Sequence, residues 1–346
     1  MRVHLVSNAP ASLRRRLCSS NLTLSGPSDS LTFPRLRLVT IWLKSIRRLL
    51  TAKIGVAIDL NTVWPVAFAR RLHSFATVLY WLDAFYGEYG ALPSTSTSLG
   101  RRTLAGLLPP DALIDVDCGR LEISRRLCRE PALSFVLRNV PPLAFARHRN
   151  ANNRSDVIKL VYSGSVTGFG AEGIQHILRA VAISKATCTL TIFPAEGSSA
   201  TGCLAGIAKE HAVEDRVTFK ERVERCHLGD ALAEFDAGVV LYPVRAGQNN
   251  NSVMAAPNKL YEYIASGLSV IASSNETMQF VSKEGLGWNI DGNSPEETAE
   301  FLNRLSRAEI EGCCRRAESA FRERYNYESQ AEPVLQWFVR RLGYDN

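Results

Sequence analysis

The segment from Pro257 to Ala272 constrains the fold of this chain more than any other. Pro257 has the backbone angle of a first helical turn, apolar side chains follow at helical spacing, and Gly267 supplies a C-terminal stop. Residues 268–272 then form a continuous apolar run, which is typical of a strand covered on both faces of a parallel sheet. A short helix that leads directly into a buried strand predicts an α/β domain.

Two charged residues lie at the start of this expected helix. Lys259 and Glu262 are three residues apart, so both project from one helix face near the N-terminus. An ammonium beside free backbone N–H groups favours an anion, and a carboxylate one turn later can accept two hydrogen bonds from a sugar diol. The same pair can equally form a salt bridge on a solvated helix. From these residues alone, both interpretations stay open.

The sequence PNKLYEYIASGLSVIA at 257–272 resembles the donor-site helix of GT-B glycosyltransferases, particularly the GT4-like group (glycosyltransferase group 1), where P-x-K-x-x-E-x-x-A-x-G-x-P-V-I recurs. The resemblance implies that Glu262 binds the ribose of a nucleotide-diphosphate sugar. It implies that Lys259 and the amides near Asn258 face phosphate or sugar, and that Lys259 stabilises the departing diphosphate. Tyr261, within the same motif, belongs to this expected donor-binding set.

A second candidate site element is the turn after the strand expected at 157–162. Its small residues let backbone amides approach a phosphate closely. The turn matches neither G-x-G-x-x-G nor a P-loop, which disfavours hydride chemistry and ATP hydrolysis. The resemblance implies that this loop, with Gly164 and Ser165, faces the donor diphosphate. It also implies that the segment after 217–219 lines the nucleotide base, so that Arg222 reaches phosphate or base.

The chain departs from the family pattern at three places. Met254 stands where the family often has a second glutamate, and Ser269 replaces the usual proline of the motif. No basic residue follows Gly170, where Glu172 occurs instead. These departures leave open the donor sugar, the retaining or inverting outcome and whether the site is fully active.

The length of 346 residues predicts two domains. The polar stretch 147–156 is the clearest break, so we expect an acceptor-side domain at 1–150 and a donor-binding domain at 151–346. The resemblance implies the GT-B fold, in which two doubly wound Rossmann-like domains face each other across a cleft and the last helix commonly returns to the first domain. Alternating segments predict strands at 54–59, 76–82, 111–117, 188–193, 216–219 and 237–242, and helices at 63–72, 203–211, 228–235, 275–281, 295–305, 308–324 and 329–342.

Charge and composition indicate which classes of partner to expect. The formal charge of +7 favours an anionic partner, such as a nucleotide diphosphate or an acidic bilayer surface. Nucleic acid is disfavoured because no dense basic run carries interleaved aromatic residues. The six histidines are isolated along the chain, which predicts no protein-bound metal and Mg²⁺ only as an ion on the nucleotide. We expect no tightly bound cofactor, with the nucleotide-diphosphate sugar acting as co-substrate.

The expected location is the cytoplasm. Eight cysteines without a C-x-x-C pair fit free thiols in a reducing compartment. No apolar run is long enough to span a membrane. The basic amphipathic segment 36–50 can lie in an anionic membrane interface, which would place the protein at the inner face of the plasma membrane. Alternatively, the same segment is a scaffold helix with its basic residues in water.

Three carboxylates follow expected strands of the first domain. Asp83 and Glu88 come after the strand at 76–82, and Asp59 ends its own strand. Ligands in open α/β sheets bind beyond the carboxyl ends of the strands, so Asp83 is a candidate general base for an acceptor hydroxyl. Helix capping by the two aspartates is the alternative. A retaining mechanism assisted by the leaving phosphate would make the base dispensable.

The resemblance implies transfer of a sugar from a nucleotide-diphosphate sugar to a hydroxyl acceptor. A lipid-linked oligosaccharide acceptor, as in bacterial surface polysaccharide assembly, would account for the basic N-terminal half. One alternative is a nucleotide-sugar 2-epimerase of the same fold. Another is a degenerate binding or scaffold subunit without turnover.

Overall fold

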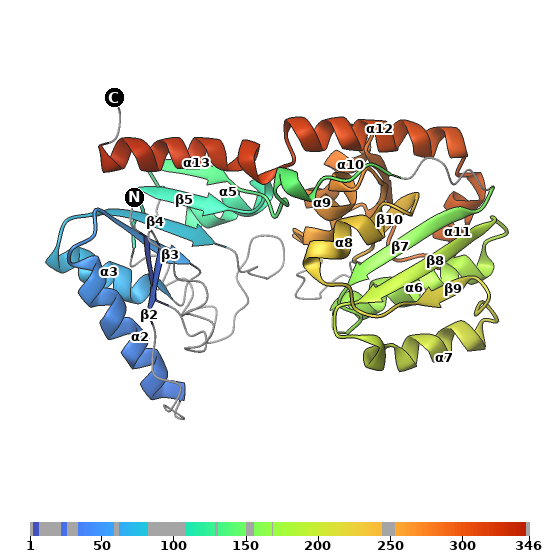
Figure 1. Ribbon diagram of the computed structural model, residues 1–346, viewed down its shortest axis with the longest axis horizontal. Coiled ribbons are helices and arrows are strands. Elements are labelled where there is room, and N and C mark those ends of the chain that lie inside the picture. Colours follow the sequence, from blue (N-terminus) through green and yellow to red (C-terminus); the bar gives the residue numbers. More distant parts are fainter. Residues whose placement is uncertain are drawn as a thin grey trace.

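The computed structural model describes residues 3–6, 22–25, 34–58, 62–81, 108–128, 131–149, 156–167, 169–243 and 253–343. Within them, two parallel sheets of four and six strands each carry packed helices, and a separate parallel pair joins β1 (Val3–Val6) to β2 (Leu22–Ser25) (Figure 1). Parallel strands alternating with helices confirm the α/β prediction. No helix among these residues is long and apolar enough to cross a membrane.

The first sheet has the strand order β3-β4-β5-β6. Its strands are β3 (Ile54–Ile58), β4 (Ala76–Trp81), β5 (Ala112–Asp115) and β6 (Leu133–Val136), and its helices are α2 (Pro34–Leu49), α3 (Val63–Leu72) and α5 (Cys118–Leu127). The strand expected at 111–117 is shorter, because Asp117 caps α5: its carboxylate accepts hydrogen bonds from the backbone N–H groups of Gly119 and Arg120. The sequence reading therefore missed α5.

The second sheet has the order β12-β11-β10-β7-β8-β9. Its strands are β7 (Ile158–Gly164), β8 (Cys188–Pro194), β9 (Val217–Phe219), β10 (Ala237–Val240), β11 (Ser269–Ser273) and β12 (Gly287–Ile290), and its helices are α6 (Phe169–Ile183), α7 (Gly202–Glu210), α8 (Arg225–Leu232), α9 (Asn258–Ala265), α10 (Phe280–Lys283), α11 (Pro295–Arg304) and α12 (Arg307–Glu323). Two expectations were wrong in detail. The helix expected at 275–281 is a 3-10 turn (Glu276–Met278) followed by the short α10, and strand β12 was not foreseen.

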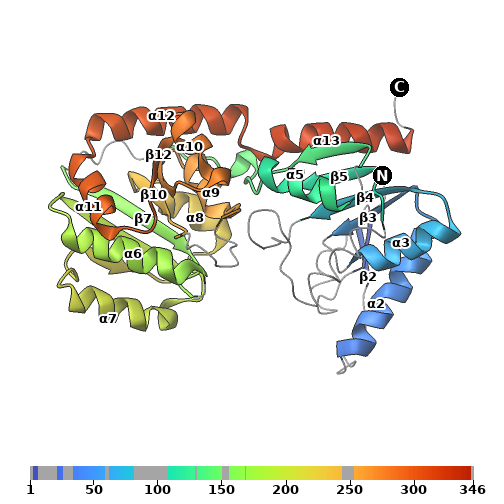
Figure 2. The same cartoon turned by 180° about the vertical axis from the view of Figure 1, so that it is seen from behind.

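Two described segments cross between the two sheets. Segment 137–149 runs from β6 along the second sheet's helices, where Phe145 packs on their core and the Arg147 N–H donates to the Ala265 carbonyl at 3.1 Å. The last helix, α13 (Tyr327–Leu342), returns to cover the first sheet, with Val334 and Trp337 in its core. Figure 2 shows α12 along one half of the molecule and α13 along the other. The domain limit at residue 150 lies outside the described residues and stays a prediction.

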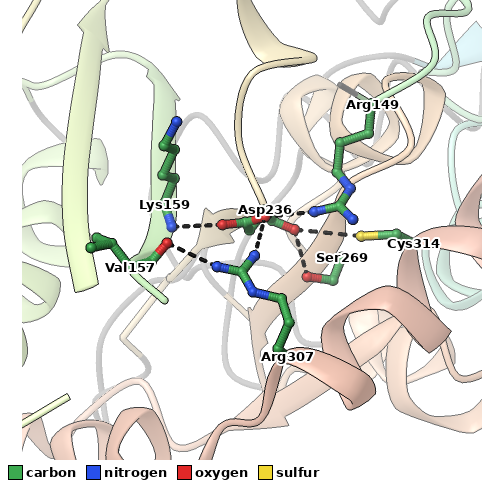
Figure 3. Close-up of polar contacts among 7 residues, drawn as sticks. All are labelled: Arg149, Val157, Lys159, Asp236, Ser269, Arg307 and Cys314. Carbon is green, nitrogen blue, oxygen red and sulfur yellow. Dashed lines mark hydrogen bonds and ion pairs between the residues drawn. The ribbon is translucent and has the colours of Figure 1, made fainter. Parts of the chain in front are cut away.

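A buried ionic cluster fixes the amino end of β10. Asp236 lies just before this strand, and its carboxylate contacts the guanidinium groups of Arg149 and Arg307, each at 2.5 Å (Figure 3). Its second oxygen accepts from the backbone N–H of Lys159 at 2.8 Å, and its carbonyl accepts from the Ser269 hydroxyl at 2.9 Å. The cluster joins the segment before β7, strand β11 and helix α12. It lies at the opposite strand end from the candidate site.

Candidate functional site

The candidate site lies where β7 ends and α9 begins. Pro257 has an extended backbone and immediately precedes α9, whose buried residues include Leu260 and Ile264. Gly267 has φ +69, a left-handed conformation that suits glycine, and it turns the chain into the fully buried β11. The predicted helix followed by a buried strand is confirmed. Because α9 begins at the carboxyl-end edge of the sheet, its free N–H groups lie where ligands of such sheets bind.

Lys259 is held between aromatic rings. Its Nζ lies 3.7 Å from the ring centroid of Tyr162 and 5.6 Å from that of Tyr242. Burial lowers the pKa of Lys259 to about 7, although the charges of Glu262 and Glu196 oppose this shift. Near neutral pH the Lys259 side chain is thus close to the midpoint of its titration. An arriving anion would favour its charged form.

Gly164 lies directly against Lys259. It has φ +136, and a Cβ added there would lie 3.1 Å from both Cε and Nζ of Lys259. A side chain at this position would therefore strain the backbone and crowd the ammonium group. The structure thus brings together two of the predicted donor-binding residues, from the β7 loop and from the first turn of α9.

Glu262 is buried one turn further along α9, with 5% of the residue exposed. Its carboxylate contacts the guanidinium of Arg225 at 3.0 Å. Burial raises the pKa of Glu262, while the charges of Arg225 and Lys259 lower it. Arg225 comes from the first turn of α8 and its side chain is 61% exposed, so the guanidinium can leave the carboxylate without crossing a packed core.

The loop after β7 already binds a carboxylate of the protein. Glu196, in the turn after β8, accepts hydrogen bonds from the Val166 N–H at 3.0 Å and the Thr167 hydroxyl at 2.9 Å. The Ser165 hydroxyl donates to the same carboxylate. Burial would raise the pKa of Glu196, but these hydrogen bonds together lower it to about 2. The predicted residue Ser165 therefore lies in a loop that holds an anion.

The remaining predicted residues lie in the core, on the surface or outside the described residues. Tyr261 is buried on the far side of α9, where its ring stacks with Phe280 and contacts Tyr325 at centroid distances of 6.0 and 5.8 Å. This packing gives Tyr261 a place in the core beside the site. Asn258 and Arg222 are exposed, at the N-terminus of α9 and before α8. Asp83, Glu88, Asp59 and the polar loop 247–252 lie outside the described residues.

Three side chains of this site were not predicted from the sequence: Arg225, Glu196 and Tyr162. The helix expected at 228–235 begins at Arg225, and this arginine contacts Glu262. A basic residue close to the start of the expected helix was the available signal for Arg225. The sequence carried no signal for Glu196, because its contacts require two loops from different strands to meet. Tyr162 was predicted only as the last residue of the strand at 157–162.

The first sheet approaches the site through α5 and the end of β6. The Asn139 side-chain amide donates to the Ala256 carbonyl at 2.8 Å, one residue before Pro257. A Cβ on Gly119 would lie 3.0 Å from the Met254 methyl group. Nearby, burial raises the pKa of Asp115 to about 6, while Arg120 at 3.3 Å opposes the shift. Asp115 is thus paired with Arg120, and Asp117 caps α5.

One group of metal-type ligands occurs within the described residues. Glu224, Cys226 and His227 have ligand atoms within 4.8 Å of one another, and all three are exposed on one turn at the start of α8. Exposed groups on a single turn do not provide the closed, supported geometry of a protein metal site, so no ion is assigned to them.

Comparison with protein-family models and with curated proteins gives no match. Solved structures do match. Sucrose-phosphate synthase from Thermosynechococcus elongatus has a TM-score of 0.70 at 17% identity, covering 95% of this chain and 85% of that one. HepE of Anabaena in complex with UDP has 0.73 at 12%, covering 97% and 92%. A Listeria monocytogenes protein described as a UDP-N-acetylglucosamine 2-epimerase has 0.57 at 12%, covering 95% and 85%.

These similarities extend over nearly the whole chain and over most of each compared structure. Together with the two parallel sheets and their helices, they define the fold as GT-B, as the resemblance of residues 257–272 implied. At such low identities the likeness concerns the fold alone. The activity must be argued from the site residues.

Proposed function

We propose that this protein is a GT4-like glycosyltransferase that moves a sugar from a nucleotide-diphosphate sugar to a hydroxyl acceptor. The observation that carries the proposal is the meeting of Lys259, Gly164 and Glu262 at the carboxyl-end edge of the second sheet. An ammonium, a glycine-bearing loop and a helix N-terminus suit a diphosphate, and a carboxylate one turn away suits a ribose diol.

The proposed chemistry takes place at the anomeric carbon. Its bond to the diphosphate oxygen breaks, the electron pair leaves with the nucleoside diphosphate, and the acceptor oxygen bonds to carbon and loses its proton. Lys259 and the α9 N–H groups would stabilise the charge on the leaving group. Whether Asp83 takes the acceptor proton, or the leaving phosphate does, depends on the inverting or retaining outcome.

The donor base can be tested first with uridine nucleotides, because HepE has been solved with UDP. We expect UDP or another nucleoside diphosphate at 100 times its Kd to stabilise the protein by about 2.7 kcal/mol in thermal unfolding. Glu262→Ala should lose this ligand-induced shift, each variant being compared with its own unliganded form. Glu300→Ala, at an exposed position of α11, is the matched control and should keep it. A shift that persists in Glu262→Ala would contradict the assigned ribose contact.

Turnover separates the transferase from its alternatives. An epimerase would convert the nucleotide-sugar without an acceptor, which NMR of the sugar protons detects. A degenerate binding subunit would bind nucleotide but release no nucleoside diphosphate with any acceptor. The transferase requires release that depends on an acceptor.

We propose a lipid-linked saccharide acceptor at an anionic membrane surface, which would fit surface polysaccharide assembly. The support is a surface on α2 and α3, whose exposed side chains include aromatic and basic groups. Trp64 and Phe68 are 39% and 42% exposed, and their rings stack at 5.5 Å. Lys44, Arg47, Arg48 and Arg71 are exposed on the same two helices. Neither described segment, 34–58 or 62–81, contains an aspartate or glutamate. We name this surface the basic aromatic face.

A further inference from the structure

Glu196 lies where the proposed function would put a phosphate. Three consecutive residues of the β7 loop direct donors at its carboxylate: the Ser165 hydroxyl, the Val166 N–H at 3.0 Å and the Thr167 hydroxyl at 2.9 Å. The two loops are also joined by their backbones, since the Ala195 N–H donates to the Gly164 carbonyl at 2.9 Å. A loop of small residues that holds a carboxylate in this way is already shaped for an oxyanion.

The charge of Glu196 also acts on Lys259. It raises the pKa of this lysine, against the larger effect of burial. The site therefore holds two carboxylates, Glu196 and Glu262, whose charges both act on one ammonium group. An arriving diphosphate would meet both the repulsion of Glu196 and the loss of the loop donors that it occupies.

We propose that Glu196 is a positioning residue that serves as an internal substitute for the donor diphosphate. Its carboxylate satisfies the loop donors and holds the loop in the observed shape. When the diphosphate binds, Glu196 yields these donors to phosphate oxygens. This inference rests on the proposed function for the identity of the ligand. No covalent bond changes, and Glu196 remains ionised and turns toward water, which it can do because it is exposed.

The exchange has a consequence for selectivity. Each anion that binds must replace three hydrogen bonds, so a weakly charged anion gains little by displacing Glu196. A diphosphate brings more charge and more acceptor oxygens. Glu196 would therefore lower the affinity for every anion at the loop while favouring diphosphates over inorganic phosphate.

The test measures the binding of UDP and inorganic pyrophosphate to the wild-type chain and to Glu196→Gln by calorimetry. The amide keeps the size of the side chain but lacks the charge. We expect about a fivefold to tenfold lower Kd for both ligands in Glu196→Gln, with a gain that shrinks as salt is raised. Thermal unfolding without ligand checks that the variant is folded.

Glu172→Gln is the matched control. Glu172 is exposed in the first turn of α6, the helix that follows the same loop, and its removal changes the net charge equally. A similar gain in this control would show general repulsion, not exchange at the loop, and would overturn the proposal. An unchanged or higher Kd in Glu196→Gln would overturn it as well.

The two ligands separate this inference from the proposed function. If UDP binds the wild-type chain and Glu196→Gln binds it no better, the transferase stands and the role of Glu196 falls. If neither UDP nor any other nucleoside diphosphate binds, but pyrophosphate binds the variant more tightly than the wild type, the loop is an anion site and the transferase falls. If no nucleoside diphosphate and no pyrophosphate binds either protein, both proposals fail.

Discussion

Two regions of the molecule, one in each half, use their charges in opposite ways. In the second half the candidate site and the Asp236 cluster hold charged groups in contact with partners, such as Glu262 with Arg225 and Asp236 with two arginines. In the first half, the basic aromatic face leaves its cations and aromatic rings exposed. The paired groups of the second half fit a small ligand that replaces internal contacts. The exposed groups of the first half fit the anionic membrane surface that we propose, where each cation adds a modest attraction.

The largest effect should follow from breaking the buried ionic cluster. Asp236→Ala leaves the guanidinium groups of Arg149 and Arg307 without their shared carboxylate, so we expect a loss of about 3–5 kcal/mol in the free energy of unfolding. Asp230→Ala removes the carboxylate that contacts Arg147 at an exposed position, where a much smaller loss is expected. Urea unfolding of both variants measures the difference. Equal losses would mean that burial does not distinguish these ion pairs.

A smaller effect is expected at the basic aromatic face. Reversing two charges with Arg47→Glu and Arg71→Glu should weaken binding to vesicles with anionic lipid by at least about tenfold, at about 1 kcal/mol for each basic residue lost. Co-sedimentation with such vesicles, and with neutral vesicles as the reference, measures it. Trp64→Ser tests the aromatic contribution separately. If the double variant sediments as the wild type does, the first half has no electrostatic membrane contact.

The smallest effect concerns the protonation of Lys259. Its folded pKa of about 7 lies below its ordinary value of 10.5, so the unfolded chain binds more protons between these pH values. This group therefore makes the empty protein more stable as pH rises from 7 toward 10, by about 1–2 kcal/mol after allowance for solvent screening. Lys259→Met should remove this pH dependence in thermal unfolding. In the wild type, binding of a diphosphate at pH 8 should take up protons, as calorimetry in two buffers would detect.

The sequence predicted the fold well wherever local signals agreed with the packing. Pro257, Gly267 and the apolar run after it marked one helix and one strand, and the structure has both. Strand β12 was missed because its four residues carry no distinct alternation, and it exists through pairing with β11. Helix α5 was missed because Asp117 was read as the end of a strand, although aspartate also caps helices.

The candidate site could be predicted only in part. Lys259 and Glu262 share a helix turn, so their proximity follows from spacing alone. Arg225 reaches Glu262 from another helix, and Glu196 reaches the β7 loop from another strand end. Contacts between such distant segments depend on the order of strands in the sheet, and this order cannot be predicted from the residues of each segment. The aromatic environment of Tyr261 likewise appears only when α9, α10 and Tyr325 come together.

Helix α13 has a consequence for the order of folding during synthesis. The face of the first sheet that carries Val78, Ala112 and Ile114 is covered by Ala331, Val334 and Trp337. These covering residues leave the ribosome after every strand of both sheets. The second sheet can close its core first, while the earlier-made sheet keeps an apolar face uncovered until α13 emerges. The N-terminal half therefore completes its core last, and its uncovered apolar face can bind chaperones or aggregate in a growing chain.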